Sequence, residues 1–195
     1  MDFQVCEESV TTIGEQARIS IVFEYDTMLE LTVAENGLGG FLFSERRLAD
    51  AQRKDYDKID GDHPANWADR FDVSNWGYIV ARSQGNRIGG AVISFNSVNV
   101  EMLEKRCDLA VLWDIRVDPA FRGHGVGAAL FHAVENWASE RKCVRLKIET
   151  QNINLAACKF YARQGCTLGA INRYAYPERM HEIQMLWYKD LRAQE

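Results

Sequence analysis

Residues 122–127, Arg-Gly-His-Gly-Val-Gly, combine a cation with three glycines where a strand-like run gives way to a helix-like one. A helix that begins at such a junction points its first backbone N–H groups outward, and its dipole adds about half a positive charge there. An anion binds such a helix end, and a diphosphate fits it best. Glycine lets the anion approach the backbone and permits positive φ angles. The sequence therefore predicts a phosphate-binding loop with Arg122 as a mobile cation; the alternative is a glycine-rich turn without a ligand.

The spacing of these glycines excludes two common phosphate-binding motifs. A P-loop requires G-x-x-x-x-G-K-[ST], and no Lys-Ser or Lys-Thr follows the glycines here. A dinucleotide site requires G-x-G-x-x-G near the first strand of a βαβ unit, whereas this chain has G-x-G-x-G late in its sequence. The spacing therefore limits which phosphate ligand the loop could bind, and the glycine-rich turn without a ligand stays the alternative.

Two elements must position this loop. Residues 109–117 form a nearly continuous apolar run, interrupted only by Asp114 and Arg116, as is typical of a central strand. After the glycines, apolar residues recur at helical spacing. These are Val126, Ala129, Leu130, Ala133, Val134 and Trp137.

The remaining pattern predicts a mixed sheet with helices packed on its faces, an α/β fold. A second helix is expected over 154–164, ending at Gly165. Gln84-Gly85-Asn86 is expected to form a hairpin turn. Further strands are expected at 18–25, 77–82, 87–94, 144–150, 166–176 and 182–189.

Residues 44–72 differ from the rest because charged residues crowd in and apolar residues thin out. We predict a charged excursion of loop character, either a solvated surface insertion or an acidic segment that attracts a cationic acceptor. Its aspartates are Asp55, Asp57, Asp60, Asp62, Asp69 and Asp72.

The composition suits one globular domain spanning residues 1–195, with 47% apolar and 26% charged residues. A net charge of −5 argues against nucleic acid as a partner. Because apolar runs fall short of the ~20 residues of a spanning helix, and the N-terminus lacks signal-peptide character, we expect no membrane association. Five widely spaced cysteines without a C-x-x-C motif indicate reduced thiols in the cytoplasm, and we expect no metal site.

Two motifs in order resemble the GNAT superfamily of acyl-CoA N-acyltransferases. The loop at 122–127 is similar to that family's R/Q-x-x-G-x-G/A loop, and 154–165 is similar to its N-x-x-A-x-x-x-Y-x-x-x-G helix. The resemblance covers residues 111–167 and implies a GNAT-like fold, a central mixed sheet flanked by helices.

A closer resemblance is to the streptothricin acetyltransferase branch, through residues 53–56, 149–152, 166–170 and 185–188. Two positions depart from it. Cys166 stands where the family usually has Phe, and Trp113 stands where this branch often has Glu. Both departures concern the acceptor more than the chemistry.

The resemblance implies that acetyl-CoA is the co-substrate and that acetyl passes directly to an amine. It implies that the pantetheine arm pairs with the backbone of the strand before the loop, where an N–H would polarise the thioester carbonyl. The implied cofactor-binding residues are Ile115, Arg116, Val117, Arg122, Gly123, His124, Gly125, Val126, Gly127, Ala128, Asn154, Ala157 and Tyr161.

The acceptor amine must be neutral to attack, and at pH 7 deprotonating a lysine-type amine costs about 4.6 kcal/mol. The candidates for the base are Glu149 and Asp114. Glu149 sits where relatives that acetylate ribosomal protein N-termini carry their base, and Asp114 is enclosed in an apolar run, which can strengthen a carboxylate as a base. The alternative for each is a structural acid paired with a neighbouring base or N–H.

Tyr161 is the candidate general acid. A tyrosine pKa near ~10 keeps the phenol protonated at pH 7, so it can donate to a departing thiolate. The alternative is an aromatic that packs on an amphipathic helix. We expect His124 to point to solvent, and we expect no nucleophilic role for Cys158 because direct transfer needs none.

Three functions follow in order of preference. The first is an acetyl-CoA-dependent N-acetyltransferase acting on a primary amine of a small cationic molecule, such as a streptothricin-like antibiotic. The second is a protein or peptide N-acetyltransferase, and the third is a non-catalytic CoA-binding regulatory module. The sequence leaves monomer or homodimer open.

Overall fold

The computed structural model describes residues 2–59, 61 and 63–191. The chain forms two compact units, each built from segments that are distant in sequence. Unit 1 comprises the described residues within 1–22, 55–148 and 188–195, and unit 2 comprises residues 23–54 and 149–187.

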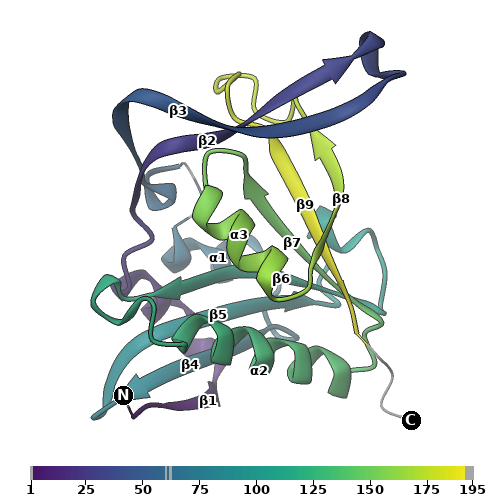
Figure 1. Cartoon of the computed structure of the whole chain (residues 1–195). Helices are drawn as coiled ribbons and strands as arrows, with labels where there is room; N and C mark the ends of the chain where they lie inside the picture. Colours follow the sequence, from purple (N-terminus) through teal and green to yellow (C-terminus); the bar gives the residue numbers. More distant parts are fainter. Residues whose placement is uncertain (1, 60, 62, 192–195) are drawn as a thin grey trace. The chain divides into compact units, whose positions relative to one another are not determined.

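The described strands form one large mixed sheet and one two-stranded sheet (Figure 1). In the large sheet the order is β1-β4-β5-β6-β7-β9-β8, and the two-stranded sheet pairs β2 with β3. The chain passes between the units within β7 and within β9. The strands are β1 (Gln4–Glu8), β2 (Phe23–Ala34), β3 (Gly40–Lys54), β4 (Gly77–Ser83), β5 (Asn86–Phe95), β6 (Leu109–Val117), β7 (Arg145–Gln151), β8 (Thr167–Asn172) and β9 (Gln184–Asp190).

In the described part of the chain, the helices contain fewer residues in total than the strands. The α-helices are α1 (Trp67–Arg70), α2 (Val126–Glu140) and α3 (Leu155–Arg163). The 3-10 helices are η1 (Val10–Arg18), η2 (Glu35–Gly37), η3 (Tyr56–Lys58), η4 (Pro64–Asn66), η5 (Glu101–Leu103) and η6 (Pro119–Phe121). No helix in the described part of the chain has the length and apolar character needed to cross a membrane.

In unit 1, α2 packs across β4, β5 and β6 (Figure 1). Its apolar stripe, which includes Leu130, Phe131 and Val134, is buried, as expected for an amphipathic helix on a sheet. The β4–β5 hairpin turns at Gln84 and Gly85, both with positive φ, as the sequence predicts. These elements fix the start of α2 at the end of β6.

In unit 2, β2 and β3 form a long antiparallel ribbon, and α3 contacts β2 and β8 (Figure 1). Asn152 ties β2 to the end of β7. Its Nδ2 donates to the carbonyl oxygen of Leu29 at 2.8 Å, and the N–H of Leu29 donates to the Asn152 carbonyl oxygen at 2.9 Å. Because Asn152 is buried, these bonds are needed to satisfy its polar groups.

The structure confirms the predicted mixed α/β sheet flanked by helices. It corrects the loop expected from residue 44 onward, because 44–54 belong to β3. Because β3 is exposed along most of its length, it needs no apolar face, and its charged residues pair with those of β2. Arg46 lies 3.3 Å from Glu30, and Arg47 lies 3.7 Å from Asp26.

Two further boundaries differ from the sequence expectation. The strand expected over 18–25 begins at Phe23, because residues up to Arg18 form η1, whose first turn is capped by Ser9. The strand expected over 166–176 ends at Asn172. In addition, β1 was not expected from the sequence, since its short run of Gln, Val, Cys and Glu has a weak strand pattern.

Candidate functional site

The loop between β6 and α2 has a conformation that requires glycine. Gly123 has φ 77° and Gly125 has φ 84°. A Cβ at either position would meet nothing within 4 Å, so the need is for the left-handed backbone and not for space. Because no atoms crowd these two positions, the loop backbone is accessible to a ligand.

The first turn of α2 begins at this loop. Gly125 occupies the N-cap position, and among the described residues no side chain caps the helix. The first-turn N–H groups of Val126, Gly127 and Ala128 therefore form an end that favours an anion. Nearby, the Arg122 Nε donates to the carbonyl oxygen of Val117 at 3.1 Å, which anchors an otherwise exposed cation.

His124 lies exposed within the loop, as expected from the sequence. Its Nδ1 lies 2.9 Å from the carbonyl oxygen of Arg122, a contact that steadies the loop. His124 therefore supports the loop conformation.

The two edges of β6 are paired to different extents. On one side β6 pairs with β5 as far as Val117, with a bulge at Trp113. On the other side 109–112 pair in parallel with 145–148 of β7. Within the described residues of unit 1, that second edge carries no strand beyond Leu112, so the backbone of Ile115 and Val117 can pair with an extended ligand.

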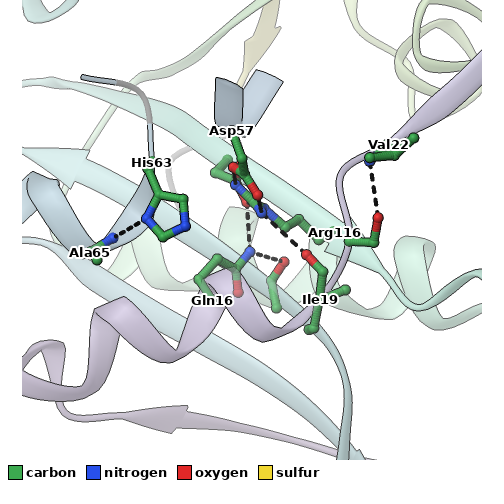
Figure 2. A network of polar contacts seen from close by, with 10 residues as sticks. Gln16, Ile19, Val22, Asp57, His63, Ala65 and Arg116 are labelled. Carbon is green, nitrogen blue, oxygen red and sulfur yellow. Dashed lines mark hydrogen bonds and ion pairs between the residues drawn. The ribbon is translucent and has the colours of Figure 1, made fainter. Parts of the chain in front are cut away.

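The side chain of Arg116 points into a buried polar network (Figure 2). The guanidinium is 1% exposed, and its two Nη atoms donate to the two oxygens of Asp57, each at 2.8 Å. Its Nε donates to Asp114 at 2.9 Å, and Nη1 also donates to the carbonyl oxygen of Ile19 at 3.1 Å. Burial opposes the charge of Arg116, but the two carboxylates outweigh that cost and raise its pKa well above the ordinary value.

Gln16 completes this network from η1. Its Nε2 donates to Asp114 at 2.6 Å and to the carbonyl oxygen of Gly90 at 3.0 Å. A Cβ at Gly90 would lie 2.1 Å from Gln16 Oε1, so only glycine fits opposite this side chain. The network thereby fixes η1, β5 and β6 together within unit 1.

These contacts bear on Asp114 as a candidate base. Its carboxylate is already paired with Arg116 and bonded to Gln16, which corresponds to the structural alternative stated for it. Glu149 is therefore the better candidate. Sequence reasoning missed Gln16 and the pairing of Asp57, because neither lies near Arg116 in the chain.

The network also changes the interpretation of the acidic segment. Asp57 is engaged with Arg116, so it is not available to attract a cation. Asp69 and Asp72 are exposed, while Asp60 and Asp62 lie outside the described residues. A steering role for the segment stays a prediction.

In unit 2, α3 begins and ends with well-formed caps. Asn154 Oδ1 accepts a hydrogen bond from the N–H of Ala157 at 3.1 Å. At the other end Gly165 has φ 78°, and the N–H of Cys166 donates to the carbonyl oxygen of Tyr161, which is a Schellman motif. These caps fix the helical turn that carries Tyr161, whose side chain is buried at 6% exposure.

The Glu149 carboxylate, on β7, receives hydrogen bonds on both oxygens. Tyr176 donates its hydroxyl to Oε1 at 2.6 Å, and Gln184 Nε2 donates to Oε2 at 2.8 Å. Sequence reasoning missed both partners, because Tyr176 and Gln184 are ordinary polar residues that lie far from Glu149 in the chain. Glu149 is half-buried and held in one orientation.

The cysteines form no disulfide bond. Burial raises the pKa of the Cys158 thiol to about 12, so this thiol stays protonated and is a poor nucleophile. Within the described part of the chain, no group of three or more His, Cys, Asp or Glu side chains is placed to hold a metal ion.

The candidate residues are divided between the units. The phosphate loop, the β6 edge and Asp114 belong to unit 1. Glu149, Asn154 and Tyr161 belong to unit 2.

Comparison with known proteins gives consistent matches. The profile of the "Acetyltransferase (GNAT) family" matches residues 44–166. Streptothricin acetyltransferase A of Bacillus subtilis (strain 168) is 30% identical over 156 residues, which are 79% of this chain and 81% of that protein.

Solved structures show the same fold. A crystal structure of nourseothricin acetyltransferase aligns with a TM-score of 0.75 at 21% identity, covering 98% of this chain and 100% of that one. A protein of Bacillus anthracis str. Ames, solved in complex with acetyl coenzyme A, aligns with a TM-score of 0.72 at 23% identity, covering 98% of this chain and 99% of that one.

The Arg116 network predicts a stability defect. Replacing Asp57 with Asn leaves a buried guanidinium without one of its two charged partners, so we expect the free energy of unfolding to fall by about 3 kcal/mol. Asp69→Asn, at an exposed position, is the matched control and should change it by under about 0.5 kcal/mol. Urea denaturation measures both, and equal midpoints for the two variants would contradict a structural role for the Asp57 pair.

Proposed function

The chain belongs to the acetyltransferase (GNAT) family and is an acetyl-CoA-dependent N-acetyltransferase, and we propose that its acceptor is a primary amine of a small cationic molecule of the streptothricin class. The support for this acceptor is the similarity to a streptothricin acetyltransferase across most of both chains. The observation that supports acetyl-CoA as the co-substrate is the glycine loop that joins the β6 edge to the start of α2.

The residues of unit 1 fit acetyl-CoA. The first-turn N–H groups of α2 and the accessible backbone at Gly123 and Gly125 would hold the pyrophosphate, with Arg122 as its cation. The open edge of β6 at Ile115, Arg116 and Val117 would pair with the pantetheine arm as a further strand would. Acetyl-CoA, when bound, supplies an acetyl group activated as a thioester.

The backbone of β6 also serves the chemistry. An N–H of this edge would donate to the thioester carbonyl, whose oxygen gains negative charge as the amine attacks. The Arg116 network holds this stretch of backbone in place through a side chain that points away into the core. Because such a donor is already in position, it would stabilise the developing charge without any rearrangement of the protein during the reaction.

Glu149 is the proposed base. It would take a proton from the acceptor's ammonium group, directly or through a water molecule, and release it to solvent after the reaction. The contacts of Tyr176 and Gln184 support this role because they fix the carboxylate in one orientation. The engagement of Asp114 with Arg116 makes it the weaker candidate.

Tyr161 is the proposed acid. The amine attacks the thioester carbonyl and forms the N–C bond. As the C–S bond then breaks, the phenol would give its proton to the departing thiolate and recover one from the positively charged nitrogen of the tetrahedral intermediate. The net products are the acetylated amine and the free thiol of CoA. Asn154 and Ala157 would contribute by starting α3 in the orientation that presents Tyr161.

We further propose that residues 1–195 act as one catalytic domain, because each unit is built from segments distant in sequence and the chain passes from one unit to the other within β7 and within β9. Five cysteines without a disulfide bond support a reducing location such as the cytoplasm.

The acceptor proposal predicts a definite substrate order. In an assay of CoA thiol release, we expect streptothricin to be turned over far faster than polyamines, aminoglycosides or N-terminal peptides. Wild-type protein without acceptor is the control for simple thioester hydrolysis. Preferential turnover of the peptides would favour a protein N-acetyltransferase instead. If none of the acceptors caused thiol release, the result would argue for a CoA-binding module without catalytic activity.

The acid role predicts a kinetic defect for Tyr161→Phe. The change removes one hydroxyl and keeps the ring, so kcat should fall ~10²- to 10⁴-fold while the KM for acetyl-CoA stays nearly constant. The loss should shrink for a thioester with a more acidic leaving thiol, since that thiolate needs less protonation. A folded variant with kcat within a few-fold of wild type would return Tyr161 to a packing role.

A further inference from the structure

The Glu149 carboxylate is contacted by three side chains of unit 2. Tyr176 and Gln151 both approach Oε1, at 2.6 and 3.4 Å, whereas Gln184 is the one described residue whose side chain donates to Oε2, at 2.8 Å. The three contacts come from different places: Gln151 is two residues along the same strand, Gln184 begins β9, and Tyr176 lies in the segment between β8 and β9. A carboxylate restrained from three directions has little freedom to rotate.

The direction of the Tyr176 proton is set by Gln151. Gln151 Nε2 lies 2.7 Å from the Tyr176 hydroxyl oxygen, and an amide NH₂ group can only donate. The hydroxyl oxygen therefore accepts from Gln151 and gives its own proton to Glu149 Oε1. Two contacts support this orientation of the Gln151 amide, because Nε2 faces both the Tyr176 hydroxyl oxygen and Glu149 Oε1, and each of these oxygens can accept a hydrogen bond.

Tyr176 is itself held by the segment that follows it. The N–H of Arg179 donates to the Tyr176 carbonyl oxygen at 2.9 Å, and the Arg179 guanidinium lies over the tyrosine ring, 5.0 Å from its centroid. Arg179 in turn lies 3.3 Å from Glu182, whose side chain is 3% exposed and also pairs with Lys54. The hydroxyl thus reaches Glu149 from a turn that is fixed at several points.

We propose that Tyr176 is a positioning residue for the reaction, which occupies Oε1 of Glu149 and leaves Oε2 as the oxygen that receives the amine's proton. The proposal rests on the proposed function, because it presumes that Glu149 is the base. A carboxylate oxygen has two acceptor positions. Oε1 has two donors facing it, and Oε2 has one, so the geometry directs an ammonium group or a bridging water to Oε2.

The test compares Tyr176→Phe with Tyr174→Phe in the full-length protein. The first change removes the hydroxyl that contacts Glu149, while Tyr174, in the same segment, is 82% exposed. Using acetyl-CoA and streptothricin, we expect Tyr176→Phe to lower kcat by about 10- to 100-fold with the KM for acetyl-CoA unchanged, since one hydrogen bond to a charged group is lost. Tyr174→Phe should match wild type within about twofold, and thermal unfolding of both variants shows whether they are folded.

A double-mutant cycle separates positioning from general structural support. If Tyr176 acts through Glu149, adding Tyr176→Phe to Glu149→Gln should cost less than about a further threefold in kcat, because the base is already lost. Gln151→Met, which removes the donor that orients the Tyr176 hydroxyl, provides a second variant with the same expected direction should Tyr176→Phe fold poorly. Multiplicative losses in the double mutant, or wild-type kcat in folded Tyr176→Phe, would overturn the proposal.

The wild-type rate distinguishes a failure of the proposed function from a failure of the proposal for Tyr176. If wild-type protein releases no CoA with streptothricin or any other amine, the proposed function fails and the role of Tyr176 fails with it. If wild-type protein is active and Glu149→Gln is impaired while Tyr176→Phe is not, the proposal for Tyr176 fails alone.

Discussion

The guanidinium of Arg116 is almost wholly buried, and each of its nitrogens donates to a carboxylate or a carbonyl oxygen. A buried charge is costly unless it is fully paired, so this one residue imposes requirements on the rest of unit 1. Asp57 and Asp114 must supply charge, Gln16 must supply a further hydrogen bond, and Gly90 must leave room for Gln16. Three segments, η1 with its C-cap Ile19, η3 and β5, are thereby fixed to β6.

In β6 the side chain of Arg116 and the backbone beside it therefore have different roles. The Arg116 side chain serves the core, and the backbone edge beside it stays open for a ligand within unit 1. The strand then leads into a loop whose glycines expose the start of α2. In the proposed site, a cofactor along this path would be recognised mainly by backbone groups, which the fold supplies in a fixed geometry.

Much of this path could be predicted from sequence because its signals are local. The apolar run of β6, the glycines at 123 and 125, and the periodicity of α2 each lie within a few residues of one another. The caps of α3 at Asn154 and Gly165 are local in the same way.

The rest depends on contacts between distant residues, which periodicity does not encode. Arg116 and Asp57 are 59 positions apart, and Tyr176 and Glu149 are 27 apart. Strand β3 escaped prediction for another reason. Its charged residues pair across an exposed ribbon, so it lacks the apolar alternation that marks a half-buried strand.

The central claim is that acetyl-CoA binds along the β6 edge and at the start of α2. Hydrogen–deuterium exchange with and without saturating acetyl-CoA tests it most directly, because backbone N–H groups that bind the cofactor must exchange more slowly. We predict slower exchange in peptides covering 113–129, with no change in β1 at Gln4–Glu8. Unchanged exchange over 113–129, under conditions where calorimetry shows the protein saturated with acetyl-CoA, would contradict the account.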